Sequence, residues 1–121
     1  MTVWLRMIFV DENKKVSIIV VNWNGERFLK DCLGALSGQT YFNYETILVD
    51  NGSSDNSISF VRENFPAIKI VSLGENTGFT GGNAAGLEVA EGDFVGLVNN
   101  DARPEKTWLE NLIQPMLADR T

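Results

Sequence analysis

The chain has 121 residues, of which 44% are hydrophobic and 21% are charged, as expected for a single soluble domain. Its net charge of -6, without a cluster of Lys or Arg, argues against general binding to nucleic acid. The sequence has no histidine and one cysteine, Cys32, which excludes Ser-His-Asp catalysis, Cys-His catalysis and an internal disulfide. Cys32 is expected to be a small buried residue of a helix.

Residues 1–15 are predicted to be an N-terminal extension that precedes a domain at residues 16–121. The first ten residues are apolar, but they contain only one basic residue, Arg6, and they are too short to span a bilayer. They also lack the small-residue cleavage site of a signal peptide. We therefore expect an additional edge segment or a loose extension.

Strand and helix patterns alternate from residue 16 onward. Short runs of apolar β-formers predict strands, and apolar residues at three- and four-residue spacing predict helices. Asp55 is predicted to be the N-cap of the second helix, and Pro104 to stand in the first turn of the last helix. In chain order, the predicted elements are strand 16–21, helix 26–36, strand 45–49, a helix between Asp55 and Pro66, strand 68–73, helix 80–90, strand 93–98 and helix 105–117.

This alternating order predicts an α/β fold. Strands that alternate with helices form parallel sheets through right-handed crossovers. We expect a Rossmann-like three-layer sandwich with a mainly parallel sheet in the strand order 3-2-1-4. No linker rich in Pro, Gly or Ser divides the chain, so a single domain is predicted.

Three of the four predicted strands end in Asn or Asp. Residues 22–25 (Asn-Trp-Asn-Gly) follow the first strand, residues 50–55 (Asp-Asn-Gly-Ser-Ser-Asp) the second, and residues 99–101 (Asn-Asn-Asp) the fourth. Because ligands of open parallel sheets bind beyond the carboxyl ends of the strands, these segments are predicted to converge on one polar site. Taken alone, each segment has a simpler interpretation as a capped or solvated turn, and Trp23 as a core residue.

The residues of this predicted site differ in chemistry. Asp50 and Asn51 can hydrogen-bond the base or ribose of a nucleoside, whereas Asp101 is a hard oxygen ligand suited to Mg²⁺ or Mn²⁺ shared with a diphosphate. Residues 78–83 place N–H groups at a helix N-terminus, where anions bind; close helix packing explains their glycines but not Asn83. No G-x-G-x-x-G follows the first strand and no P-loop sequence occurs, which disfavours dinucleotide oxidoreductases and P-loop NTPases.

Taken together, these segments resemble the nucleotide-binding half of an inverting family 2 glycosyltransferase with the GT-A fold. The resemblance rests on residues 16–25, 47–55, 76–83 and 97–101, and it covers nearly everything from residue 16 to residue 117. The succession Asp-Asn-Gly-Ser, Asn-x-Gly-Phe and Asn-Asn-Asp is most similar to the rhamnosyltransferase-like branch, whose donors are often dTDP-linked deoxysugars.

The resemblance implies a role for each residue of the site. Many members of the family have Asp where this chain has Asn51, and Asp-x-Asp where it has Asn99 and Asp101, so the choice of base is left open. Asp101 would hold a divalent metal ion, Mg²⁺ or Mn²⁺. The implied nucleotide-binding residues are Val21 and Asn22 in the nucleoside pocket, Asp50 and Asn51 at the base, Asn99 and Asn100 near the ribose, and Asn83 at the start of a helix.

The reaction implied is transfer of a sugar from a dTDP- or UDP-linked donor to a hydroxyl group of a carbohydrate or lipid-linked acceptor. Such a transfer would serve the synthesis of cell-surface polysaccharide, in the cytoplasm or at the inner face of the membrane. The family's general base and acceptor site are expected beyond Thr121, so this chain would carry the donor-binding part and be inactive alone.

Two other classes of function stay open at this stage. The chain could be a non-catalytic nucleotide-binding module or a half-domain completed by a partner chain, and a homodimer is also open. A nucleotidyltransferase that forms sugar nucleotides has a related α/β plan, but that class usually has a Gly-rich loop with Arg and Lys after the first strand, which residues 22–26 lack.

Overall fold

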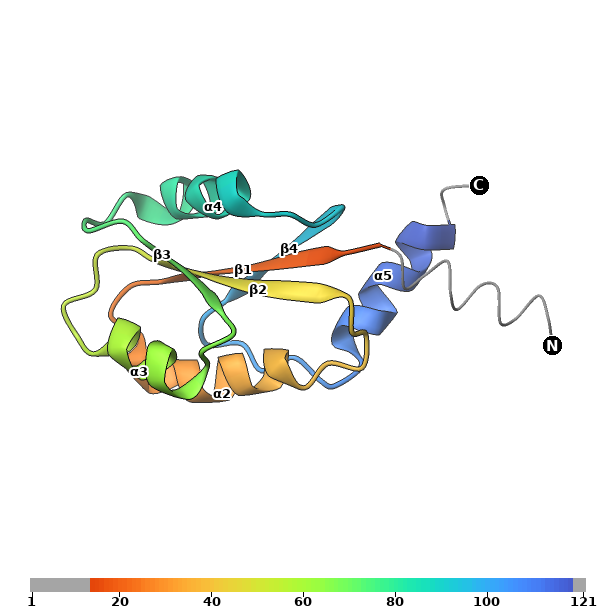
Figure 1. Cartoon of the computed structure of the whole chain (residues 1–121), viewed down its shortest axis with the longest axis horizontal. Helices are drawn as coiled ribbons and strands as arrows, with labels where there is room; N and C mark the ends of the chain where they lie inside the picture. Colours follow the sequence, from red (N-terminus) through yellow and green to blue (C-terminus); the bar gives the residue numbers. More distant parts are fainter. Residues whose placement is uncertain (1–13, 119–121) are drawn as a thin grey trace.

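The computed structural model describes residues 14–118, in which four strands alternate with four helices (Figure 1). The predicted extension at residues 1–15 therefore lies, except for its last two residues, outside the described part. The elements are β1 (Val16–Asn22), α2 (Glu26–Ser37), β2 (Tyr44–Asp50), α3 (Ser57–Asn64), β3 (Lys69–Ser72), α4 (Gly78–Val89), β4 (Phe94–Asn99) and α5 (Trp108–Ala118).

The four strands form one parallel sheet in the order β3-β2-β1-β4, which confirms the predicted topology. Asn22 of β1 stands opposite Asp50 of β2, and Val21 stands opposite Asn99 of β4. Because all strands run in the same direction, their carboxyl ends meet at a single edge of the sheet. This register brings the three polar strand ends together.

The core has two parts, one on each face of the sheet. In Figure 1, α2 and α3 cover one face and α4 covers the other. Successive side chains of a strand point to opposite faces, so each buried strand contributes residues to both parts of the core. The first part contains Ile18, Val20, Leu48 and the buried residues of α2, namely Leu29, Cys32, Leu33 and Leu36; the second contains Ile19, Ile47 and Val49.

The last helix begins later than the sequence predicts. α5 begins at Trp108, so the prediction that Pro104 stands in its first turn is wrong. The backbone before it is held by the residues that follow α2: Gln39 Nε2 donates to the Glu105 carbonyl at 2.8 Å, and Thr40 N donates to the Lys106 carbonyl at 2.9 Å. Gln39 Oε1 also accepts from Leu109 N at 2.9 Å, which fixes where the helix starts.

Two other helix starts are shifted by one or two residues. α4 begins at Gly78 rather than residue 80. The N-cap of α3 is Asn56, so the prediction that Asp55 is the cap is wrong by one position. Asp55 still satisfies the helix start, because its Oδ1 accepts from Ser57 N at 3.0 Å and from the Ser57 hydroxyl at 2.6 Å. Within residues 14–118, no helix is long and apolar enough to cross a membrane.

Candidate functional site

Asn22, Asp50 and Asn100 form a hydrogen-bonded cluster at the carboxyl ends of β1, β2 and β4. Asn22 Nδ2 donates to Asp50 Oδ1 at 3.1 Å, and Asn22 Oδ1 accepts from Asn100 Nδ2 at 3.0 Å. Asn22 and Asp50 are both buried. The structure therefore brings together three of the predicted site residues, one from each of three adjacent strands.

Ser53 completes the environment of the Asp50 carboxylate. The Ser53 hydroxyl donates to Asp50 Oδ1 at 2.7 Å, and Ser53 N donates to Asp50 Oδ2 at 2.9 Å. The same hydroxyl accepts from Asn24 N at 2.8 Å, which ties the loop after β1 to the loop after β2. A buried carboxylate needs such partners, and here each of its oxygens has at least one.

Gly25 lets the two asparagines approach each other. A Cβ at this position would lie 2.2 Å from Asn100 Nδ2 and 2.5 Å from Asn22 Oδ1. Any other residue would push into the hydrogen bond between them. Gly25 is therefore needed for the geometry of the site, although in the sequence it is only the last residue of a polar segment.

Asn51 lies on the other side of the sheet from Asp50, towards α4. Its Oδ1 accepts from Thr77 N at 2.8 Å and from the Thr77 hydroxyl at 2.9 Å, and its Nδ2 donates to the Gly78 carbonyl at 2.9 Å. The residue is only 2% exposed. Its side chain is therefore engaged within the protein, and a nucleotide could contact it only by displacing these bonds.

The other predicted residues line the same edge at different depths. Val21 is partly buried against α4, where Asn83 is also buried. Asn99 and Asp101 are exposed, so both are accessible to a ligand. Trp23 is 54% exposed and lies outside the core, so its simpler interpretation as a core residue is wrong.

The pKa of the Cys32 thiol depends on burial and on the negative charge of Asp101. Burial, together with the negative charge of Asp101, raises the pKa of the Cys32 thiol to about 11. The thiol therefore stays protonated at neutral pH and does not act as a nucleophile. Its burial in α2 confirms the prediction of a small buried residue.

A divalent metal ion would have one carboxylate ligand here, that of Asp101. Within residues 14–118, no group of three or more Asp, Glu, Cys or His side chains could hold a metal ion. Mg²⁺ in nucleotide enzymes is commonly bound by one or two protein carboxylates plus substrate phosphates. The exposed Asp101 fits that arrangement, with diphosphate oxygens supplying the remaining ligands.

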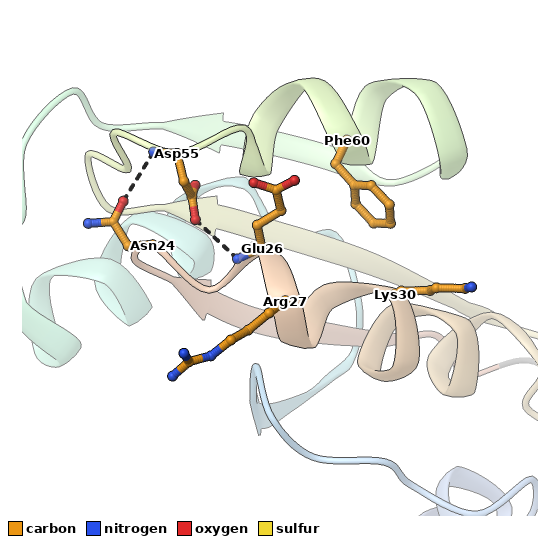
Figure 2. A pocket seen from close by; sticks show the side chains of 6 residues that line it. All are labelled: Asn24, Glu26, Arg27, Lys30, Asp55 and Phe60. Atoms are coloured by element: carbon orange, nitrogen blue, oxygen red, sulfur yellow. Dashed lines mark hydrogen bonds between the residues drawn. The ribbon is translucent and has the colours of Figure 1, made fainter.

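A depression of about 490 Å³ adjoins the site on the outer side of α2 and α3. In Figure 2, Asp55 and Glu26 lie side by side, with the Asp55 carboxylate bonded to Glu26 N, while Arg27 and Lys30 point away from them. It contains none of the predicted nucleotide-binding residues, so we do not assign it to a ligand. Its lining residues are Asn24, Glu26, Arg27, Lys30, Asp55 and Phe60.

Sequence reasoning missed the supporting residues Ser53 and Thr77. Both occur in segments that the sequence analysis singled out, at residues 50–55 and 76–83, but neither stood out there. A hydroxyl beside a glycine in a strand-end loop is a weak signal that such a residue bonds the backbone or a neighbouring carboxylate.

A parallel α/β sheet with polar residues at its carboxyl edge defines a class of proteins that bind ligands at that edge. Residues 17–121 match the model of the family Glycosyl transferase family 2. This chain belongs to that family, and its fold is of the GT-A type.

Three known proteins illustrate the similarity. The uncharacterized glycosyltransferase YibD of Escherichia coli is 29% identical over 91% of this chain and 33% of its own length. TarS 1-349 of S. aureus in complex with UDP superimposes with a TM-score of 0.75 at 28% identity, over 81% of this chain and 30% of that TarS fragment. The mannosyltransferase PcManGT of Pyrobaculum calidifontis, in complex with GDP-Man and Mn²⁺, gives 0.71 at 28% identity, over 75% of this chain and 28% of PcManGT. The chain thus spans about a third of the length of the curated relatives it matches.

Proposed function

We propose that this chain binds the nucleoside diphosphate of a sugar donor at the carboxyl ends of β1, β2 and β4. The observation that carries the proposal is the hydrogen-bonded cluster of Asn22, Asp50 and Asn100, which joins the three strands at the edge where such folds bind ligands. Family membership supports it, as do the UDP and GDP-Man complexes of TarS and PcManGT.

The base is the part of the donor that Asp50 would read through Oδ2, which accepts from Ser53 N alone and keeps a second acceptor position, whereas both acceptor positions of Asn51 Oδ1 are used. Asp50 is 1% exposed, so the loop at Ser53 would have to shift to admit the base. A carboxylate accepts hydrogen bonds only, and the imide N–H of uracil or thymine is a donor that suits it. Asp50 is thus compatible with the UDP- or dTDP-linked donor that the resemblance implies. Val21 and Asn22 would line the nucleoside pocket, with Asn99 and Asn100 near the ribose and Asn83 at the start of α4. Asn51, also predicted at the base, would support the site through its hydrogen bonds to Thr77 and Gly78.

Asp101 would hold Mg²⁺ or Mn²⁺ together with the diphosphate. The protein carries a net charge of -6, so the negative phosphates need a compensating cation near the site. When bound, the metal ion stabilises the charge that develops on the leaving diphosphate.

The complete enzyme would transfer the sugar, with inversion, to a hydroxyl group of a carbohydrate or lipid-linked acceptor in cell-surface polysaccharide synthesis. We place this reaction in the cytoplasm or at the inner face of the membrane. Inversion requires a general base that deprotonates the acceptor. We assign that base and the acceptor site to protein outside this chain, supplied in a longer polypeptide or by a partner, which includes the case of a homodimer.

Calorimetric titration tests the donor site. We expect UDP and dTDP to bind, and Mn²⁺ to strengthen the binding of both. Asp101→Asn should abolish the strengthening by Mn²⁺ and barely change the fold, because an exposed carboxylate makes few packing contacts. Asp50→Ala should weaken the binding of both nucleotides with or without Mn²⁺, and unchanged binding would contradict the role of Asp50. Full Mn²⁺ dependence in Asp101→Asn would contradict the role of Asp101.

A further inference from the structure

The side chain of Asn51 connects the end of β2 to the start of α4. Both lone pairs of its Oδ1 are used, by the amide N–H and the hydroxyl of Thr77, the N-cap of α4. Its Nδ2 donates to the Gly78 carbonyl. The amide therefore acts as acceptor and donor towards two successive residues of one turn, which we call the Thr77–Gly78 turn.

Close packing of two glycines also restrains the position of this turn against the sheet. A Cβ on Gly52 would lie 2.7 Å from the backbone of Glu75, and a Cβ on Gly82 would lie 2.7 Å from the Val21 side chain. The loop before α4 and the first turns of α4 thus touch the ends of both β1 and β2. Residues 76–80 are themselves exposed, so the contacts of Asn51 are the buried anchor of an otherwise exposed segment.

We propose that Asn51 is a positioning residue of the donor site. It holds the Thr77–Gly78 turn, and with it the start of α4, at the edge of the nucleoside pocket, and it does not itself contact the nucleotide. This inference rests on the proposed nucleotide site, and it changes the role that the sequence suggested for Asn51 from direct base contact to support.

The position requires an amide rather than a carboxylate. Asp at position 51 could accept from Thr77, but its second oxygen would face the Gly78 carbonyl with no proton between them. Two oxygens without a shared proton repel each other, and the Gly78 carbonyl loses the donor that Asn51 supplies. A protonated Asp restores the donor, so the held turn favours the protonated form and raises the pKa of such a residue.

This difference gives the experiment a pH signature. A raised pKa means that the turn is held at low pH and released as the pH rises through that pKa. We would compare wild type, Asn51→Asp and Asn51→Ala at about pH 5 and about pH 8, values that bracket a raised carboxyl pKa. Hydrogen exchange at Thr77–Gly82 reports the turn without nucleotide, and calorimetry with UDP reports the site.

The matched control is Asn64→Asp. Asn64 is exposed in α3 and its Nδ2 also donates to a carbonyl, that of Phe60, at 2.9 Å. The substitution changes the charge equally, but water can replace the lost bond. We expect this variant to behave as wild type at both pH values.

For Asn51→Asp, we expect fast exchange in the turn and about tenfold weaker UDP binding at high pH, the loss of roughly one hydrogen bond, with recovery of both at low pH. Asn51→Ala, which adds no charge, should lose both at either pH. Weakened UDP binding with an intact turn would show direct contact and overturn the proposal. A released turn with unchanged UDP binding would also overturn it, while leaving the nucleotide site standing. Failure of the wild type to bind UDP while its turn stays protected would refute the proposed function instead.

Discussion

At the scale of single residues, the site depends on close approach between polar side chains. Asn22 bonds both Asp50 and Asn100, and Gly25 is small enough to leave their contact undisturbed. Each member of the cluster is held by another, so the geometry presented to a ligand is fixed before the ligand arrives. Such preorganisation reduces the ordering cost of binding.

Gly25→Ala should damage this cluster. The added methyl group would meet Asn100 Nδ2 and Asn22 Oδ1, and we expect a loss of about 1–3 kcal/mol in the free energy of unfolding. Urea denaturation measures the loss, and UDP titration should show weakened binding.

The control for this prediction is Gly34→Ala. Gly34 lies within α2, is exposed, and has nothing within 4 Å of an added Cβ. Ala favours helix over Gly, so this variant should gain about 1 kcal/mol in stability. Equal effects of the two substitutions would contradict the steric argument.

At the scale of secondary-structure elements, α2 and α3 satisfy each other's first turns. Asp55 Oδ2 accepts from Glu26 N at 3.2 Å (Figure 2). Glu26 Oε1 in turn accepts from Asn56 N at 3.1 Å. Asn24, whose φ of 49° lies in the left-handed region, accepts from Ser54 N at 2.7 Å. Each carboxylate thus stands at the positive end of the neighbouring helix.

Asp55→Ala should weaken this pairing of helices. Burial tends to raise the pKa of Asp55, but hydrogen bonds from Ser57 and from Glu26 N outweigh it, and the pKa is lowered. A lowered pKa means that the stabilisation is complete above the ordinary pKa of Asp and is lost as the pH falls through the lowered value. At neutral pH we expect Asp55→Ala to cost about 1 kcal/mol of unfolding free energy, as for other lost helix caps.

The difference between this variant and wild type should shrink as the pH falls to about pH 3, and urea denaturation at both pH values measures it. Asp31→Ala is the control. Asp31 is exposed and its ion pair with Arg103 is on the surface, so its loss should change stability little. A pH-independent cost for Asp55→Ala would argue against stabilisation by the ionised carboxylate.

At the scale of the whole molecule, every predicted donor-site residue lies on elements that meet at one edge of a single sheet. The sheet is parallel throughout, so the helices cover its faces and leave the carboxyl edge accessible. The chain spans about a third of the length of its curated relatives. Donor binding and acceptor activation are thus separable properties in our proposal.

We expect the 121-residue chain to bind a nucleotide-sugar without transferring the sugar. Binding would be followed by calorimetry, and transfer by chromatography of labelled sugar after incubation with Mn²⁺ and candidate polysaccharide acceptors. The mannosyltransferase PcManGT, with GDP-Man and Mn²⁺, serves as the positive control for the assay. Turnover by the isolated chain would contradict the assignment of the general base to protein outside it.

Much of the fold could be predicted because its signals are local. The apolar runs of the four strands and the helical spacing between them predict the order of elements, and crossover handedness then limits how they pair. Element ends were less predictable, as Trp108 and Asn56 show, because they depend on partners elsewhere in the chain. Gln39, in the loop after α2, bonds the backbone of Glu105 and Leu109 and so decides where α5 begins.

The sequence by itself determined the family pattern, the parallel sheet and the location of a polar edge. The roles of neighbouring residues at that edge came only from the tertiary structure, and the nucleotide contacts themselves stay a prediction. Asp50 and Asn51 are adjacent in sequence, yet one bonds Asn22 and Ser53 while the other bonds Thr77 and Gly78. The physical reason is that successive side chains of an extended chain point to opposite faces of a sheet, where they meet residues that sequence order does not identify.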